Sequence, residues 1–221
     1  GAGSVLLNRE PSPIETFNDL DGALVNFFRV LRRQTRALCE AIRYTPYSRE
    51  EFILSLDCGP DVPPLERARR FYVRAGQCFN GKVQRTTQGD WASDRSKSSC
   101  GCSKSVSRWL NKQHNLPVIA ERLRRVQIEH LPAVDVIAKY DTPDTLFYCD
   151  PPYIHDTRGD SKAYGYEMSN RDHRDLAEVL NGIQGMAAIS NYDCELMDEL
   201  YPPSRWRKIV GEERTNHATK G

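Results

Sequence analysis

The chain has 221 residues, of which 28% are charged and 39% hydrophobic, and its formal net charge at pH 7 is only +1. This composition is typical of a globular α/β domain with a modest second module. It has no apolar run of about 18 residues and no leader-like N-terminus, so we expect neither a membrane span nor a signal peptide. Seven irregularly spaced cysteines favour reduced, intracellular thiols over a secreted disulfide framework.

The predicted elements begin with a glycine turn over 1–4 and a short strand over 14–19. Apolar residues at helical spacing then predict one long helix over 22–44. Its core-facing side carries Leu24, Phe27, Phe28, Leu31, Leu38 and Ile42. Residues 45–64 are broken by prolines and glycines, which predicts irregular structure before a second helix over 64–77.

Residues 78–108 are rich in Ser, Gly, Thr, Lys and Arg and poor in aliphatic residues. Such a stretch builds little core of its own, which predicts loops or a hairpin. The region 82–125 has ten Lys and Arg against three Asp and Glu, whereas 141–221 has nine against fifteen. This asymmetry indicates a polyanion such as nucleic acid as a partner, although a solvated loop balanced by its neighbours would also explain it.

The remaining chain alternates strands with helices, which predicts a mostly parallel, doubly wound α/β sheet. The strand over 145–149 should be buried, because its apolar and aromatic residues are consecutive. Ser169 and Asp172 resemble the capping box of a helix. The predicted elements are a helix at 116–125, a strand at 125–131, a helix at 133–140, the strand at 145–149, a helix from 169, a strand at 186–192, a helix at 194–201 and a last strand at 206–210.

Three strand ends carry residues that suit ligand binding, which in open α/β sheets occurs beyond the carboxyl ends of the strands. The first is the glycine turn, whose Gly1 and Gly3 would allow close approach of a cofactor. The second is Asp19, which could accept hydrogen bonds from both hydroxyls of a ribose, or could simply be a helix cap or turn residue. The third is the run Asp150-Pro151-Pro152-Tyr153.

The run Asp150-Pro151-Pro152-Tyr153 combines a carboxylate, a stiff backbone and an aromatic ring. A carboxylate and a fixed carbonyl can accept both hydrogens of an exocyclic amine, and the tyrosine offers a stacking face. A proline turn that only closes a strand would explain the prolines but not their two neighbours. The three strand ends therefore predict a nucleoside cofactor and a planar substrate that bears an amine.

The same run resembles the catalytic motif of amino-methylating DNA methyltransferases, and "GAGSV" is similar to the end of their cofactor motif. Four further segments resemble, in order, the DNA adenine methylase (Dam-like) family, especially its phage and prophage members. They are "NDLDGALVNFFRVLR", "FYVRAGQCFNGKVQR", "RLRRVQIEHLPAVDVIAKYDTPDTLFYCDPPY" and "AISNYDCELMDELY". The resemblance covers nearly the whole chain, but the start of the cofactor motif and the family's last strand are absent. We therefore expect a fragment that is truncated at both ends.

The resemblance implies an enzyme that transfers a methyl group from S-adenosylmethionine to N6 of an adenine flipped out of double-stranded DNA. An RNA adenine methyltransferase and a non-catalytic DNA-binding remnant are the alternatives. The implied fold is a Rossmann-like methyltransferase domain over 1–45 and 116–221, with a mainly helical or loop target-recognition insert over 46–115. We expect a monomer in the cytoplasm of a bacterial or phage-infected cell, with a restriction endonuclease as a candidate counterpart.

The resemblance also assigns roles to individual residues. The catalytic residues would be Asp150, Pro151, Pro152 and Tyr153. The cofactor would contact Gly1, Gly3, Ser4, Asp19, Glu129, His130 and Leu131. DNA would contact Asn80, Lys82, Arg85, Arg95, Lys97, Lys104 and Arg108. Arg85 is the candidate for guanine, because a guanidinium can bind O6 and N7 together. No metal is expected, because Cys100 and Cys102 lack the spacing of a structural zinc site.

Overall fold

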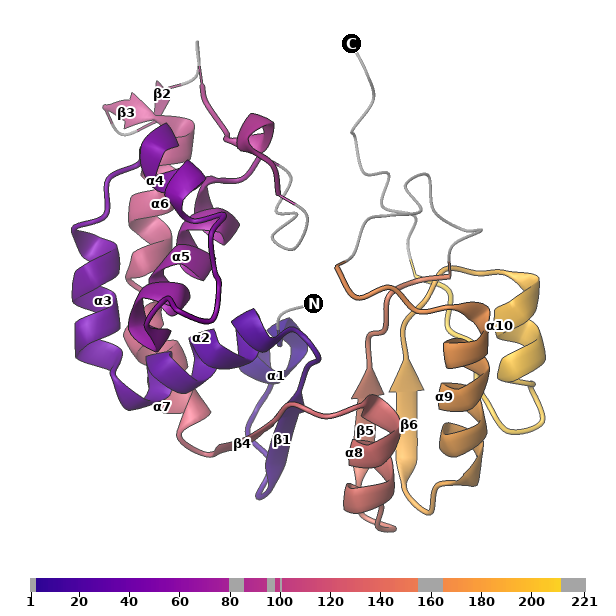
Figure 1. Cartoon of the computed structure of the whole chain (residues 1–221). Coiled ribbons are helices and arrows are strands. Elements are labelled where there is room, and N and C mark those ends of the chain that lie inside the picture. Colours follow the sequence, from indigo (N-terminus) through magenta and orange to yellow (C-terminus); the bar gives the residue numbers. More distant parts are fainter. Residues whose placement is uncertain (1–2, 80–85, 95–97, 100, 155–164, 212–221) are drawn as a thin grey trace.

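The computed structural model describes residues 3–79, 86–94, 98–99, 101–154 and 165–211. Its N-terminal part (residues 3–129) contains the elements α1 to α7 and β1 to β4, and its C-terminal part (residues 133–211) contains α8 to α10 with β5 and β6 (Figure 1). The elements are α1 (Ser4–Asn8), β1 (Glu15–Asn18), α2 (Gly22–Arg33), α3 (Thr35–Arg43), α4 (Arg49–Leu54), α5 (Pro64–Gln77), the 3₁₀ turn η1 (Gln88–Asp90), β2 (Ser98–Ser99), β3 (Cys102–Ser103), α6 (Lys104–Gln113), α7 (Leu116–Leu123), β4 (Val126–Glu129), α8 (Ala133–Tyr140), β5 (Leu146–Cys149), α9 (Asn170–Gly182), β6 (Met186–Ile189) and α10 (Glu195–Leu200). None of the described helices is long and apolar enough to cross a membrane.

Two parallel strand pairs organise the described chain, since β1 pairs with β4 and β5 pairs with β6. Asn18 lies opposite Glu129, and Cys149 lies opposite Ile189, so the two carboxyl ends of each pair share an edge. The four strands and their parallel direction confirm the prediction. A single doubly wound sheet is not evident among the described residues, whose strands form these two pairs and the short antiparallel pair of β2 and β3.

The N-terminal part has one large core in which α5 packs across α2 and both contact α3, α6 or α7. Asp21 caps α2, because its carboxylate accepts hydrogen bonds from the backbone amides of Ala23 and Leu24 at 2.9 and 3.4 Å. All six residues that we predicted to face the core are buried. Aromatic packing joins the helices, with the rings of Phe27 and Phe71 5.4 Å apart.

The predicted long helix over 22–44 is wrong in one respect, because the chain forms two helices with a break at Gln34. The backbone of Gln34 leaves helical geometry (φ −132°, ψ 41°), and the hydroxyl of Thr35 donates to the carbonyl of Leu31 at 2.7 Å. Leu31 and Leu38 lie on opposite sides of the break and are both buried. Since the apolar pattern continues across it, hydrophobic periodicity could not reveal the break.

The prediction of loops over 78–108 is also wrong at its end, because α6 begins at Lys104. Ser103 caps this helix by accepting a hydrogen bond from the amide of Val106 at 3.3 Å. Trp109 anchors it in the core, where its ring lies so close to Gly76 that a Cβ there would come within 2.6 Å. The stretch is poor in aliphatic residues, but the single large side chain of Trp109 provides the buried anchor of the helix. The short helix α4 was not predicted either.

A buried ion pair ties α7 to β1. Both guanidinium NH₂ groups of Arg122 donate to the carboxylate of Glu15, at 2.5 and 2.7 Å, and one also donates to the carbonyl of Leu6 at 3.2 Å. The side chain of Glu15 is only 2% exposed. The hydrogen bonds from Arg122 hold the pKa of this carboxyl below its usual value, although burial opposes the shift. The pair therefore joins three elements of the N-terminal part: α1, β1 and α7.

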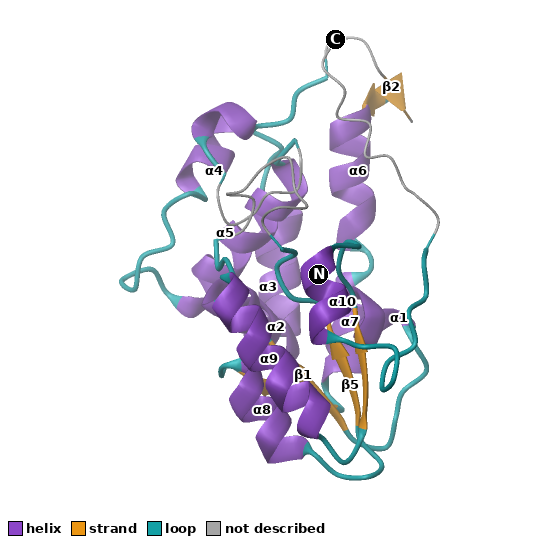
Figure 2. Cartoon of the chain, turned by 90° about the vertical axis from the view of Figure 1, so that its right-hand side faces the viewer, coloured by secondary structure: helices purple, strands orange, loops and turns teal. Residues whose placement is uncertain are grey.

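The C-terminal part has a smaller core, in which α8 and α9 pack side by side (Figure 2). The predicted capping box of α9 is confirmed, with Ser169 and Asp172 each accepting a hydrogen bond from the other's backbone amide. Ile137, Leu176 and Leu180 form the fully buried centre of this core. They pack against alternate residues of β5 and β6, so these helices cover one face of the strand pair.

Two expectations for the C-terminal part are wrong. The strand over 145–149 is not buried on both faces, because Leu146 and Tyr148 are 53% and 49% exposed and Met186 beside them is 60% exposed. No described helix covers that face. Residues 206–210 form no strand, and Ile209 and Val210 are both 79% exposed. Within the described residues no strand edge pairs with this segment, so its β-branched composition alone did not make it a strand.

Candidate active site

The carboxyl ends of β1 and β4 bring together four of the residues that we predicted to contact the cofactor: Asp19, Glu129, His130 and Leu131. The side chain of Asn18 makes two hydrogen bonds with the backbone of Leu131. Its Nδ2 donates to the carbonyl of Leu131 at 3.0 Å, and its Oδ1 accepts from the amide of Leu131 at 3.1 Å. His130 Nε2 lies 3.1 Å from the carbonyl of Leu20. The loop after β4 is thus fastened beside Asp19, and Asn18 is a positioning residue that sequence reasoning missed.

Asp19 is half-buried and has a structural contact of its own. Its Oδ1 accepts a hydrogen bond from the backbone amide of Asp21 at 2.8 Å. Asp19 thus makes the contact of a turn residue, the residue that caps α2 is Asp21, and the contact of Asp19 with a ribose stays a prediction. Burial raises the pKa of Asp19. Leu20 and Leu131 are 45% and 36% exposed, so apolar side chains stand next to this carboxylate.

Glu129 differs from its neighbours because α8 already engages its carboxylate. Lys139 Nζ and the hydroxyl of Tyr140 both donate to Glu129 Oε1 at 2.7 Å. The hydrogen bond from Lys139 lowers the pKa of Glu129. This side chain therefore fastens β4 to α8 through Oε1.

The glycine turn at the start of the described chain has the geometry that glycine allows. Gly3 has a positive φ of 73°, and a Cβ there would lie 3.2 Å from the ring of Phe17. Any other residue would be strained by the backbone and crowded by the ring. Ser4 begins α1 directly after this turn. Gly1, the other predicted glycine, lies outside the described residues.

The run 150–153 leaves β5 at the edge where β6 also ends. β5 stops at Cys149, as the following prolines predicted, and Asp150 is exposed at that edge. The hydroxyl of Ser190, the first residue after β6, donates to Asp150 Oδ1 at 2.7 Å. Burial of the carboxyl raises the pKa of Asp150, but hydrogen bonds, including that from Ser190, outweigh it and hold the pKa below its usual value. Asp150 is therefore an ionised acceptor at neutral pH.

The rest of this run is also supported by residues that follow β6. Asn191 Oδ1 accepts hydrogen bonds from the amides of Ile154 and Tyr192 at 3.3 and 2.9 Å. The rings of Tyr153 and Tyr192 meet edge to face, with centroids 4.9 Å apart. Sequence reasoning assigned no role to Ser190, Asn191 and Tyr192. The available signal was topological, because β6 is the parallel neighbour of β5 and its end must lie beside residue 150.

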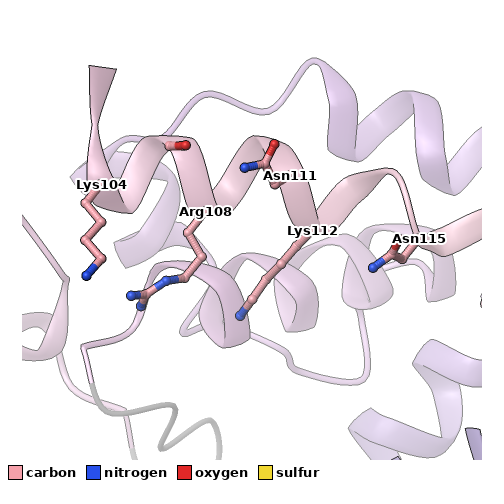
Figure 3. Close-up of a pocket in the computed structure, with 6 residues that line it drawn as sticks. Lys104, Arg108, Asn111, Lys112 and Asn115 are labelled. Atoms are coloured by element: carbon pink, nitrogen blue, oxygen red, sulfur yellow. The ribbon is translucent and has the colours of Figure 1, made fainter. Parts of the chain in front are cut away.

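Only two of the seven predicted DNA contacts, Lys104 and Arg108, fall in the described chain, and both lie on α6. They line an open hollow of about 350 Å³ together with Ser107, Asn111, Lys112 and Asn115. Lys104, Arg108 and Lys112 extend from the same side of the helix (Figure 3). Sequence reasoning missed Lys112, although it follows Arg108 by one helical turn. The other five predicted contacts, Asn80, Lys82, Arg85, Arg95 and Lys97, lie outside the described residues.

Comparison with known proteins gives one family. The family model described as D12 class N6 adenine-specific DNA methyltransferase matches residues 1–216. The matched range includes the residues at the ends of β1 and β4, those at the ends of β5 and β6, and the side of α6 that carries Lys104, Arg108 and Lys112, which we call the α6 face. No curated protein matches the chain.

Proposed function

The chain belongs to the D12 class N6 adenine-specific DNA methyltransferases, and we propose that its two parallel strand pairs divide the reaction between them. Enzymes of this family transfer a methyl group from S-adenosylmethionine to N6 of adenine in DNA, and the family implies a Rossmann-like fold. In our proposal the ends of β1 and β4 hold the cofactor, and the end of β5 holds the target adenine. The main support is that each pair presents a carboxylate, Asp19 or Asp150, at its carboxyl edge.

The residues at the ends of β1 and β4 fit S-adenosylmethionine chemically. The carboxylate of Asp19 can accept hydrogen bonds from the two ribose hydroxyls, since its Oδ1 already orients it through the amide of Asp21. The exposed side chains of Leu20 and Leu131 offer an apolar surface for the adenine ring of the cofactor. Gly3 allows the first turn to pack closely against the ring of Phe17, which lies on the core-facing side of β1. When bound, the cofactor supplies an electrophilic methyl group.

The residues at the end of β5 fit the target base. The ionised carboxylate of Asp150 and the carbonyl of Pro151 would accept the two hydrogens of N6, and the ring of Tyr153 would stack on the base. This arrangement directs the nitrogen lone pair at the methyl group, so that transfer is direct and needs no covalent enzyme intermediate. Flipping the adenine out of the duplex costs a few kcal/mol, which contacts with the base and the DNA backbone must offset.

The α6 face fits the phosphate backbone of that DNA. Lys104, Arg108 and Lys112 follow one another at intervals of four residues, about 6 Å along the helix axis. Within the described residues no carboxylate forms a salt bridge with any of the three. Asn111 and Asn115 add neutral donors along the same hollow. Long cations and amides on one helix side are suited to phosphate contacts, which position the protein without selecting a sequence.

We further propose that the two strand pairs belong to one doubly wound sheet of the type that we expected from the sequence. Both pairs are parallel, and each of the strands β1, β4, β5 and β6 leads into a helix. This is the order in which doubly wound sheets are built. The monomeric state, the three-part domain division and a restriction endonuclease counterpart stay predictions.

The test is methyl transfer from labelled S-adenosylmethionine to duplex DNA. Asp150→Ala should reduce transfer about 10³-fold, because one of the two acceptors that orient N6 is lost. Asp144→Ala is the matched control, since this exposed aspartate lies just before β5. It should transfer at the wild-type rate. An Asp150→Ala enzyme that still methylated at a comparable rate would refute the role of Asp150.

A further inference from the structure

The segment directly after β6, Ser190-Asn191-Tyr192, contacts the run 150–154 at successive points. Ser190 reaches the carboxylate of Asp150, Asn191 reaches the amide of Ile154, and Tyr192 lies against the ring of Tyr153. Three consecutive residues of one strand end thus engage three groups of the neighbouring strand end. Ile154 is 1% exposed, so the far end of the run is anchored in the protein.

The hydroxyl of Ser190 is not required to hold β6 in place. The backbone amide of Ser190 already donates to the carbonyl of Cys149 at 3.0 Å, which continues the parallel pairing by one residue. The hydroxyl adds a separate hydrogen bond of 2.7 Å to Asp150 Oδ1. Removing the hydroxyl would therefore leave the backbone pairing intact and take away one of the contacts of the Asp150 carboxylate, together with the hydroxyl's own 3.4 Å hydrogen bond to the carbonyl of Cys149.

Ser190 supplies one of the contacts that hold the carboxylate of Asp150. Asp150 is exposed, whereas the prolines that follow it restrict only the backbone. A carboxylate that rotated about its side-chain bonds would present its oxygens in several directions. Pinning Oδ1 orients the group as a whole, and effective transfer requires an alignment that tolerates little misplacement.

We propose that Ser190 is a positioning residue for methyl transfer, which acts by orienting the carboxylate of Asp150 toward N6 of the flipped adenine. Asn191 and Tyr192 complete the same support by holding the backbone after Tyr153 and the edge of its ring. This inference rests on the proposed role of Asp150 as an acceptor for N6. It differs from that role because Ser190 itself touches neither substrate nor cofactor.

The experiment compares Ser190→Ala and Ser190→Thr with wild-type enzyme at saturating S-adenosylmethionine and duplex DNA. Ser190→Ala should lower kcat about 10- to 100-fold, while the affinities for DNA and for S-adenosylmethionine change less than about threefold. Ser190→Thr keeps a hydroxyl and should recover kcat to within a few-fold of wild type. Ser204→Ala, at an exposed serine of the same part, is the control and should behave as wild type.

Three outcomes would overturn the proposal: full kcat in Ser190→Ala, a loss that Ser190→Thr does not recover, or a loss of kcat that accompanies an equal loss of DNA or cofactor affinity. Asp150→Ala, measured in parallel, separates this inference from the function on which it rests. If Asp150→Ala is inactive and Ser190→Ala is fully active, only the role of Ser190 fails. If Asp150→Ala is also active, the assignment of Asp150 fails and the role of Ser190 fails with it.

Discussion

The N-terminal part and the C-terminal part each contain one parallel strand pair, but different interactions stabilise them. In the N-terminal part, helices pack around one large core, and the ion pair of Glu15 with Arg122 is buried beneath α1. Among the described residues of the C-terminal part, the smaller core centres on Ile137, Leu176 and Leu180, and one face of β5 and β6 is exposed. There the charged contacts lie at the surface, as between Arg174 and Glu199, whose side chains are 51% and 58% exposed.

The difference indicates how each part positions its site. The proposed cofactor residues follow strands that pack against the large core, and a turn hydrogen bond orients Asp19. The proposed catalytic run follows a strand with a smaller core, and the polar and aromatic contacts of Ser190, Asn191 and Tyr192 support it. Packing therefore dominates in one part and specific side-chain contacts dominate in the other.

The largest expected effect on stability is that of Arg122→Ala. It should lower the free energy of unfolding by about 3–5 kcal/mol, because it leaves the carboxylate of Glu15 buried without its cation. The counterpart Arg174→Ala, in the exposed pair of the C-terminal part, should leave it nearly unchanged. Urea unfolding of both variants measures the contrast, and equal effects would show that the two parts do not differ in this way.

A smaller effect is expected from Gly185→Ala, at the start of β6. A Cβ at Gly185 would lie 2.5 and 2.7 Å from the backbone carbonyl oxygens of Thr145 and Thr142. The backbone must shift to accommodate it, at a cost of about 1–3 kcal/mol. Gly182→Ala is the control, since nothing lies within 4 Å of its added Cβ. Thermal unfolding that showed the two variants equally stable would mean that β5 and β6 are not held this tightly.

Acid should weaken the N-terminal part through Glu15. Its folded pKa lies below the ordinary value of 4.5, so the ion pair contributes full stability above that value. The contribution is lost as the pH falls through the lower, folded pKa. Glu15→Gln should therefore flatten the decline in unfolding free energy between about pH 6 and about pH 3. If the unfolding free energy of this variant declined with falling pH as steeply as that of the wild type, the acid sensitivity would come from other carboxylates.

The smallest effect concerns DNA anchoring by the N-terminal part. Lys112→Ala should weaken binding to any duplex by a few-fold and reduce the slope of log affinity against log salt by about one, because one phosphate contact is lost. Arg205→Ala, at an exposed cation of the C-terminal part, should change neither quantity. Fluorescence anisotropy over a salt series makes the comparison. A loss confined to one DNA sequence would instead indicate base contact by Lys112.

The sequence predicted the four long-range strands, the helix ends at α5 and α8 and the capping box of α9, because local chemistry decides these features. It did not predict the break at Gln34 or the helix α6. In both cases tertiary packing decided the outcome, through a continuous apolar face around Leu31 and through the single buried Trp109. The strand ends led to Asp19 and Asp150 as candidates, and the structure places them directly after the carboxyl ends of β1 and β5. Contacts across strands, such as that of Ser190 with Asp150, depend on pairing that no local pattern contains.

The division of the reaction between the two strand pairs is tested most directly by measuring cofactor binding and methyl transfer in the same two variants. Asp19→Asn keeps the oxygen that accepts the amide of Asp21, yet it should weaken S-adenosylmethionine binding about tenfold or more in calorimetry, because a charged acceptor becomes neutral. Asp150→Ala should bind S-adenosylmethionine as wild type does and fail to methylate duplex DNA. Cofactor affinity that fell with Asp150→Ala and stayed unchanged with Asp19→Asn would contradict the assignment of the two sites.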